Sequence, residues 1–132
     1  MSNAKPFVFV LMPFDQDFDD IYHLGIKSSV KAAGFVAERV DEQKFSEPML
    51  ERIYRQIDTC DFVIADMTGK NPNVFYEVGY AHAKGKICTL LTQNTSDIPF
   101  DLKHHRHLVY DGSISTLKSQ LLEELKLSLI HI

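Results

Sequence analysis

One stretch of the sequence decides the fold: residues 61–84, which read DFVIADMTGKNPNVFYEVGYAHAK. Its apolar run 62–65 predicts a short central strand of a parallel sheet, because such strands are covered on both faces. Asp66 ends that run. Asn71 and Pro72 are residue types that begin helices, the first as a cap and the second as the first helical residue. The stretch therefore predicts a strand, a loop and a helix.

Glu77 is the unusual residue of this predicted helix, because its neighbours are mostly apolar or small. Asn73, Glu77, Tyr80 and Lys84 are spaced so that they form one polar stripe on an otherwise apolar helix. Such a stripe can line a pocket. Alternatively, Glu77 forms an ion pair with Lys84 or His82 on a solvent-exposed face, and the pattern alone leaves both interpretations open.

Apolar runs and helical patterns alternate along the rest of the chain. The predicted strands are 7–12, 35–40, 62–65, 87–91 and 107–110, and the predicted helices are 21–34, 49–58, the one after Asn71, and 113–126. This alternation predicts an α/β fold, a flavodoxin-like three-layer sandwich with a five-stranded, mainly parallel sheet. In such sheets ligands bind at the carboxyl ends of the strands, so we expect a pocket formed by Glu77 and the loops after Met12, Asp66 and Leu91.

The length of 132 residues predicts a single domain, which we place at residues 1–126. A net charge of -4 and a pI near 5.8 argue against a nucleic-acid partner. No apolar run reaches the length of a membrane span and the first residues lack a signal core, so we expect a cytoplasmic protein without a membrane partner. His104 and His105 match no usual metal site, and we expect no metal and no cofactor.

The last six residues, 127–132, read LSLIHI and break the pattern of the final helix. The same hexapeptide is encoded by the common transposon-end sequencing adapter. We therefore predict that residues 127–132 are a non-native tail.

Four segments, in this order, give the chain a resemblance to a known family: VLMPF at 10–14, ADMT at 65–68, NPNVFYEVGYAHA at 71–83 and IPFD at 98–101. Together they resemble the nucleoside 2-deoxyribosyltransferase-like superfamily, and specifically a bacterial branch related to TIR domains. In the transferases, the matching helix carries an acid that precedes a small apolar residue and a glycine, and this acid attacks the sugar carbon. Glu77, followed by Val78 and Gly79, occupies the matching place.

The resemblance implies roles for particular residues. Glu77 is the implied nucleophile, and Asp66 is the candidate for a second catalytic carboxylate that holds sugar hydroxyls or assists proton movement. Thr68 and Asn73 could bond to sugar or phosphate, and the rings of Phe14 and Tyr76 could stack on the base. The predicted substrate-binding residues are Met12, Phe14, Thr68, Asn73, Tyr76 and Tyr80.

Two departures from the family pattern bear on the substrate. Phe75 and Tyr76 stand where the transferases usually have a serine and a glycine, and residues 12–14 replace the glycine-rich opening of the nucleotide hydrolases. Because of these departures, the prediction names no particular substrate. The resemblance implies cleavage or transfer of the N-glycosidic bond of a nucleoside or nucleotide. The alternatives are a TIR-like NAD hydrolase and a non-catalytic nucleotide-sensing or interaction domain. Because related transferases complete their sites across a subunit interface, the resemblance also implies a homodimer or a larger homo-oligomer.

Overall fold

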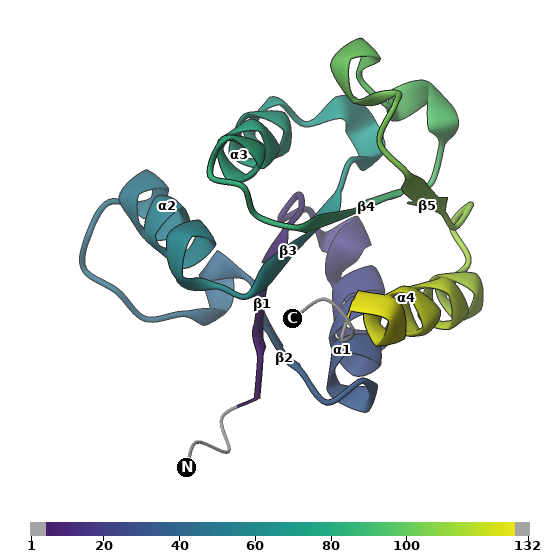
Figure 1. Cartoon of the computed structure of the whole chain (residues 1–132), viewed down its shortest axis with the longest axis horizontal. Helices are drawn as coiled ribbons and strands as arrows, with labels where there is room; N and C mark the ends of the chain where they lie inside the picture. The colour runs from purple at the N-terminus through teal and green to yellow at the C-terminus, as the bar shows by residue number, and fades with distance from the viewer. Residues whose placement is uncertain (1–4, 129–132) are drawn as a thin grey trace.

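A five-stranded parallel sheet forms the centre of the computed structural model, which describes residues 5–128 (Figure 1). The strand order is β2-β1-β3-β4-β5. The strands are β1 (Phe7–Leu11), β2 (Val36–Glu38), β3 (Phe62–Asp66), β4 (Cys88–Thr92) and β5 (His107–Val109). The predicted flavodoxin-like α/β fold is therefore confirmed, and all four strand pairings are parallel where a mainly parallel sheet was expected.

Helices cover both faces of this sheet (Figure 1). The longer ones are the π-helix η2 (Ile21–Lys27), which continues into α1 (Ser28–Ala32), and α2 (Met49–Thr59), α3 (Pro72–Ala83) and α4 (Ile114–Ser128). Short 3-10 turns are η1 (Gln16–Phe18), η3 (Val40–Glu42), η4 (Thr68–Lys70), η5 (Thr95–Asp97) and η6 (Phe100–Leu102). η2, α1 and α4 pack on one face, whereas α2 and α3 pack on the other.

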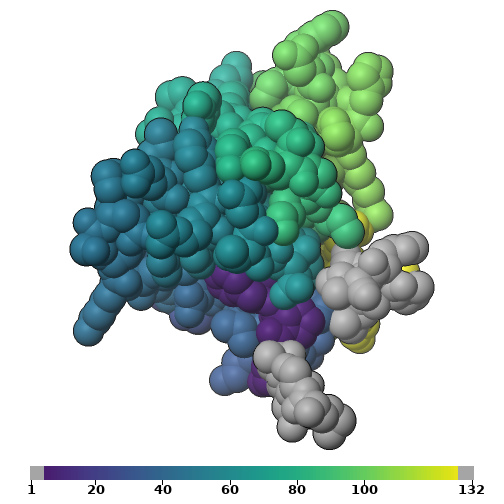
Figure 2. Space-filling view, turned by 60° about the vertical axis from the view of Figure 1, so that its left-hand side comes forward, coloured from purple at the N-terminus to yellow at the C-terminus, as the bar shows by residue number. Residues whose placement is uncertain are grey.

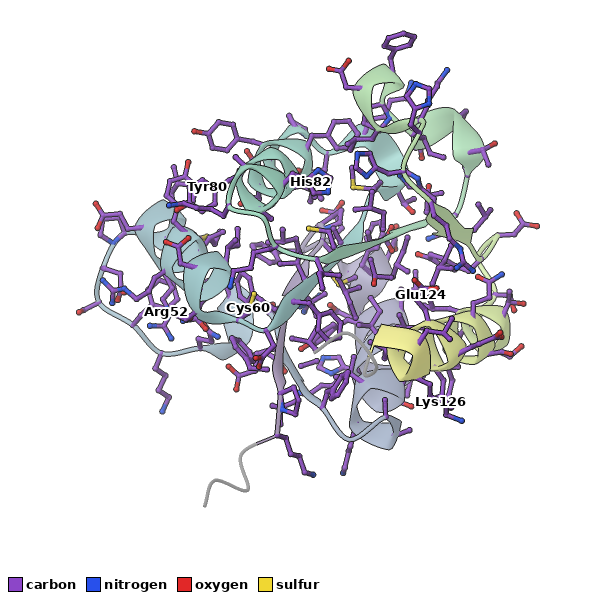
Figure 3. All side chains as sticks on the ribbon, in the orientation of Figure 1. Arg52, Cys60, Tyr80, His82, Glu124 and Lys126 are labelled. Atoms are coloured by element: carbon purple, nitrogen blue, oxygen red, sulfur yellow. The ribbon has the colours of Figure 1, made fainter. Side chains whose placement is uncertain are left out.

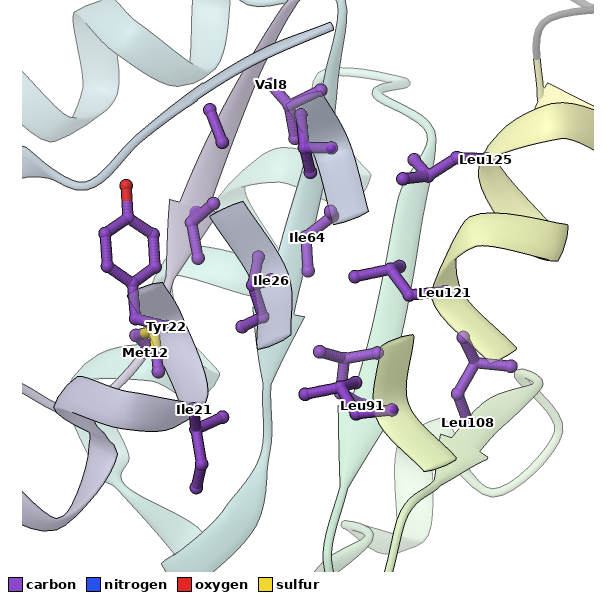
Figure 4. Packing of buried hydrophobic residues seen from close by; sticks show 14 of the residues in the cluster. Val8, Met12, Ile21, Tyr22, Ile26, Ile64, Leu91, Leu108, Leu121 and Leu125 are labelled. Atoms are coloured by element: carbon purple, nitrogen blue, oxygen red, sulfur yellow. The ribbon is translucent and has the colours of Figure 1, made fainter. Parts of the chain in front are cut away.

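Strict alternation within the strands supplies a separate core to each face. In β1, Val8 and Val10 face η2, α1 and α4, and Phe9 faces α2 and α3. Figure 4 shows the first core, where Leu121 of α4 points toward the sheet beside Leu91. Because both faces are covered, β3 is buried along its whole length, as its unbroken apolar run predicted.

The structure differs from the sequence-based prediction at β2, which ends at Glu38 rather than at residue 40. Arg39 leaves the strand with its side chain buried, and its guanidinium bonds to Asp41 through two nitrogens at 3.0 and 2.9 Å. The same guanidinium lies 4.3 Å from the centre of the Tyr22 ring. The pattern indicated a partly exposed strand residue at position 39, whereas Arg39 is buried and lies outside the strand. Val40 begins the turn η3.

The carboxyl ends of β1 and β3 lie next to each other, because Leu11 pairs with Ala65 in the sheet register. From β1 the chain crosses to the edge strand β2, and from β3 it crosses toward β4 on the other side. This is the switch point at which open α/β sheets bind ligands. α3 begins there as predicted, since the Asn71 side chain accepts the backbone N–H groups of Asn73 and Val74 at 2.9 and 3.2 Å.

Within residues 5–128, no helix is both long and apolar enough to cross a membrane. α4 extends through Ser128, so the predicted non-native tail begins inside this helix. The remainder of that tail, residues 129–132, lies outside the described residues.

Candidate functional site

A pocket of about 320 Å³ opens at the switch point between β1 and β3. Its walls come from the loop after β1, the first turns of α2 and the first turns of α3. Figure 2 shows α2 and α3 side by side. The lining residues are Met12, Pro13, Phe14, Met49, Leu50, Ile53, Asn71, Asn73, Val74 and Glu77.

Glu77 lies in this pocket, and its half-buried carboxylate forms no hydrogen bond or ion pair with any residue of the described part of the chain. Burial alone raises the pKa of Glu77 from its ordinary value to about 7. The alternative of an ion pair is not formed, because Lys84 lies 3.9 Å from Asp58 and His82 stacks on His105 with ring centres 4.8 Å apart. The polar stripe therefore does place an unpaired acid in a pocket.

Most of the pocket wall is apolar. Phe14, Met49 and Leu50 are about half exposed and stand around the opening, whereas Ile53 and Val74 are buried. Few polar groups are available to solvate the carboxylate of Glu77, which explains why burial dominates its pKa.

Amide side chains form the polar end of the pocket. Asn71, the cap residue of α3, and Asn73 and Glu77 in its first turns line the pocket together. The Oδ1 atom of Asn71 is used by the helix cap, which fixes the orientation of this side chain. Asn73 is exposed, and its amide is available to a bound molecule. An apolar wall facing a few polar groups is the usual arrangement of a small-molecule site.

Asp66, the second predicted catalytic residue, does not line this pocket. It is fully buried, and its Oδ1 accepts the backbone N–H and the hydroxyl of Thr68 at 3.0 and 2.6 Å. Its Oδ2 accepts the hydroxyl of Tyr110 at 2.5 Å. Burial raises the pKa of Asp66, while these three hydrogen bonds oppose the rise. Thr68 also accepts the backbone N–H of Gln93, so the cluster joins the loops that follow β3, β4 and β5.

Tyr76 and Tyr80 also lie outside the pocket lining, on the part of α3 that meets α2. Tyr80 stacks on Tyr54 with ring centres 4.2 Å apart, and its hydroxyl lies 3.1 Å from both carboxylate oxygens of Asp58. The Tyr54 hydroxyl donates to the hydroxyl of Tyr76 at 2.8 Å. Figure 3 shows Tyr80 and His82 projecting from different sides of α3.

Of the predicted site residues, the structure brings four together in the pocket: Glu77, Asn73, Met12 and Phe14. It places Asp66, Thr68, Tyr76 and Tyr80 elsewhere. The sequence reasoning did not select Asn71, Met49, Leu50 or Ile53. A signal for α2 existed, because a helix that follows a parallel strand begins at the carboxyl edge of the sheet, so its first turn belongs among the candidates.

No group of three potential metal ligands comes together among residues 5–128. His105 stacks on His82 of α3. Nothing in the pocket lining besides Glu77 is an ionisable side chain.

Comparisons with known proteins identify a family and structures of similar fold. The family model described as nucleoside 2-deoxyribosyltransferase matches residues 35–121, which is more than half of the chain. No curated protein matches the sequence significantly.

Solved structures with the same fold include enzymes and a designed protein. The CMP N-glycosidase BcmB of Clostridium botulinum is 22% identical with a TM-score of 0.66, over 87% of this chain and 96% of the other. A 2-deoxyribosyltransferase of Bacillus psychrosaccharolyticus is 11% identical with a TM-score of 0.67, over 87% and 95%. A de novo designed Rossmann 2x3 protein is 14% identical with a TM-score of 0.58, over 93% and 90%.

Proposed function

Because the chain belongs to the nucleoside 2-deoxyribosyltransferase family, we propose that it cleaves or transfers the N-glycosidic bond of a nucleoside or nucleotide through Glu77. One observation carries this proposal: the Glu77 carboxylate has no partner among the described residues and lies in a pocket large enough for a small ligand. An unpaired, partly buried acid lowers the stability of the fold, and such groups concentrate at functional sites.

The proposed reaction has two steps. An oxygen of ionised Glu77 bonds to C1′ while the C1′–N bond breaks, and the departing base takes the bonding electrons and then a proton from water. The carboxylate also stabilises the positive charge that develops at C1′. In the second step, water or another base attacks C1′, the bond between C1′ and the Glu77 oxygen breaks, and the proton of the attacking group passes to solvent. The ring of Phe14 offers a face for the base, and Asn73 offers an amide to the sugar.

The pKa of Glu77 gives the reaction a pH dependence. With a pKa of about 7, the ionised fraction of the free enzyme rises as the pH passes through neutrality. A nucleophilic role therefore predicts that kcat/KM for a nucleoside without other titrating groups rises from pH 6 to pH 8. If Glu77 acted as a proton donor, kcat/KM would fall over the same range.

A catalytic role for Asp66 stays a prediction. Its hydrogen bonds support a role in holding the loop from Thr68 to the cap residue Asn71, which reaches the pocket. The homodimer or larger oligomer also stays a prediction. Exposed Phe14, Met49 and Leu50 at the opening are compatible with contact to a second copy, and light scattering of the purified chain tests it.

Chromatographic detection of free base tests the proposal. The protein is incubated separately with deoxynucleosides, nucleoside monophosphates and NAD, and with a second base as acceptor to separate transfer from hydrolysis. The expected result is free base or an exchanged nucleoside from at least one substrate. The Glu77→Gln variant is the matched control, and equal product from both proteins would overturn the role of Glu77. Release of nicotinamide from NAD alone would favour the TIR-like alternative.

A non-catalytic nucleotide-binding domain is the second candidate, and the position of Asp66 favours it. A glycosidase ordinarily uses two carboxylates near the scissile bond, whereas the pocket lining here contains only Glu77. Saturable stabilisation of the protein by a nucleoside or nucleotide, together with complete recovery of that ligand after hours of incubation, would select this candidate.

A further inference from the structure

A buried arginine that does not line the pocket contacts one of the pocket walls from behind. We infer that Arg39, which follows β2, is a positioning residue: its guanidinium holds the Phe14 ring in the wall and thereby sets how tightly the pocket binds its substrate. This role in substrate binding rests on the function proposed above, whereas the contact between Arg39 and the wall does not.

The segment 13–20 supplies the wall that contains Phe14, and much of this segment has little packing of its own. Residues 14–17 are exposed, and Phe18 is only partly buried against the core. A half-exposed aromatic ring on an exposed loop has several orientations open to it. The orientation of Phe14 that lines the pocket therefore depends on a group outside the segment.

Arg39 contacts this segment on both sides of the turn η1. Its guanidinium carbon lies 5.9 Å from the centre of the Phe14 ring, and one guanidinium nitrogen lies 3.6 Å from a carboxylate oxygen of Asp19. A cation within about 6 Å of an aromatic ring attracts it, and more strongly when the cation is withdrawn from water. Arg39 is only 4% exposed. One buried cation thus holds two points of the segment.

The guanidinium of Arg39 is itself fixed. Asp41 accepts hydrogen bonds from two of its nitrogens, and the buried ring of Tyr22 lies 4.3 Å from it. The Tyr22 hydroxyl donates to Glu42, which also accepts the backbone N–H of Arg39 at 3.1 Å. A planar guanidinium held in this way is preorganised, so it loses little freedom when it contacts the Phe14 ring.

Stability alone does not account for an arginine at this position. Among residues 5–128, the buried Nη1 of Arg39 has no hydrogen-bond partner. Buried ion pairs often stabilise a fold no better than apolar side chains of similar size, and an unpaired buried nitrogen adds a cost. An apolar side chain could pack on Tyr22, but it would not hold Asp19 or attract the Phe14 ring as a cation does. The orientation of segment 13–20 explains the buried cation better than stability does.

Hydrogen exchange tests the contact without any substrate. The Phe18 N–H donates to the Asp15 carbonyl at 2.9 Å, so its exchange rate reports on the order of η1. In Arg39→Met, which removes the charge, we expect this amide to exchange about three- to tenfold faster while the amides of β3 keep their rates. Equal exchange of the Phe18 amide in the parent protein and in folded Arg39→Met would overturn the inference.

Two further variants make this measurement decisive. Arg52→Met is the matched control, because Arg52 lies 5.6 Å from the centre of the Phe45 ring and does not line the pocket. It should leave the exchange of the Phe18 amide unchanged. Arg39→Lys serves if Arg39→Met does not fold, since it keeps a buried cation but lacks the planar fork. Exchange of the Phe18 amide in Arg39→Lys at the rate of the parent protein would also overturn the inference.

Kinetics test the effect on substrate binding. For each substrate that gives product in the assay above, Arg39→Met should raise KM about three- to tenfold and change kcat by less than about twofold. A role in stability alone would leave KM of the folded variant unchanged, and Arg52→Met should keep the KM of the parent protein. In a Phe14→Leu background, Arg39→Met should have little further effect on KM, because the ring through which it acts is gone.

The outcomes separate this inference from the proposed function. Equal effects of Arg39→Met on KM with and without the Phe14 ring would overturn the inference and leave the proposed function standing. Absence of product from every substrate with the parent protein would overturn the proposed function, and the exchange of the Phe18 amide would still decide whether Arg39 holds the segment.

Discussion

Two carboxylates lie at the carboxyl edge of this sheet, and their surroundings are opposite. Burial raises the pKa of both Glu77 and Asp66. Asp66 accepts three hydrogen bonds from Thr68 and Tyr110, whereas Glu77 accepts none from the described residues. The comparison separates two uses of a buried acid: Asp66 joins loops and contributes to stability, while Glu77 lowers stability and is available to a ligand.

The largest expected effect concerns activity and would break the comparison most directly. Glu77→Gln keeps the size of the side chain but removes the nucleophile, so we expect kcat to fall by about 10³-fold or more. Asp66→Asn should lower kcat by a smaller factor if Asp66 only positions the loop to Asn71. Rates of base release by the three proteins, measured under single-turnover conditions, check both values.

The result for Asp66 separates a catalytic from a positioning role. A catalytic carboxylate predicts a loss as large as that of Glu77→Gln and a shifted pH profile. A positioning role predicts that kcat/KM falls partly through KM and that the pH profile keeps its midpoint. Equal losses of kcat in Asp66→Asn and Glu77→Gln would mean that the two carboxylates do not differ in role.

The second effect concerns stability. Asp66→Ala leaves the buried hydroxyl of Tyr110 and the backbone N–H of Thr68 without their acceptor, and we expect the free energy of unfolding to fall by about 3 kcal/mol. Glu77→Ala removes no hydrogen bond with a described residue and should cost much less. Urea unfolding followed by circular dichroism gives both values, and the reverse order would contradict the assignment of roles.

The third effect is a pH-dependent gain in the stability of the Glu77→Gln variant over the parent protein. The pKa of Glu77 rises from 4.5 in the unfolded chain to about 7 in the fold, so the unfolded chain loses this proton first as the pH rises. Below pH 4.5 the Glu77 side chain is protonated in both states and costs the fold no stability. As the pH rises from 4.5 through 7, the unfolded chain ionises first and the fold loses stability. A glutamine side chain does not titrate, so Glu77→Gln should gain about 1–2 kcal/mol relative to the parent protein between pH 5 and pH 8, after allowance for the partial exposure of this position.

Unfolding curves of both proteins at pH 5, 6, 7 and 8 measure this gain. Only the change with pH matters, because the substitution can alter packing by a constant amount at every pH. A difference in unfolding free energy that stays constant over this range would show that a charged group or solvent compensates the Glu77 carboxylate in the fold.

The same two acids show how far the sequence alone could predict the site. The apolar run 62–65 placed Asp66 at the strand end, and Asn71 with Pro72 located the start of α3, because these signals are local. Helical spacing placed Asn73 and Glu77 on one side correctly. The partner of Asp66 is Tyr110, 44 residues away, and no local pattern encodes that contact.

Tyr80 shows where helical spacing alone fails to predict a pocket residue. It shares the polar stripe with Glu77, but Tyr54 and Asp58 of α2 occupy its ring and hydroxyl. The spacing defines which side chains share a face, whereas the packing of α2 against α3 decides which part of that face remains open. Met49 and Leu50 were missed for the same reason, since they line the pocket only because α2 packs there.

The smallest effect sharpens the comparison from the side of Asp66. Tyr110→Phe keeps the buried ring but removes the hydroxyl that donates to Asp66 Oδ2 at 2.5 Å, and we expect a loss of about 1 kcal/mol. Because both groups belong to one hydrogen-bonded cluster, the loss in Asp66→Ala with Tyr110→Phe should be smaller than the sum of the two single losses. Additive losses in this double-mutant cycle would mean that the hydroxyl and the carboxylate stabilise the fold independently. The hydrogen bonds from Thr68 would then be the only ones that stabilise the Asp66 carboxylate, and the residue after β5 would not help to hold the loop that leads to Asn71.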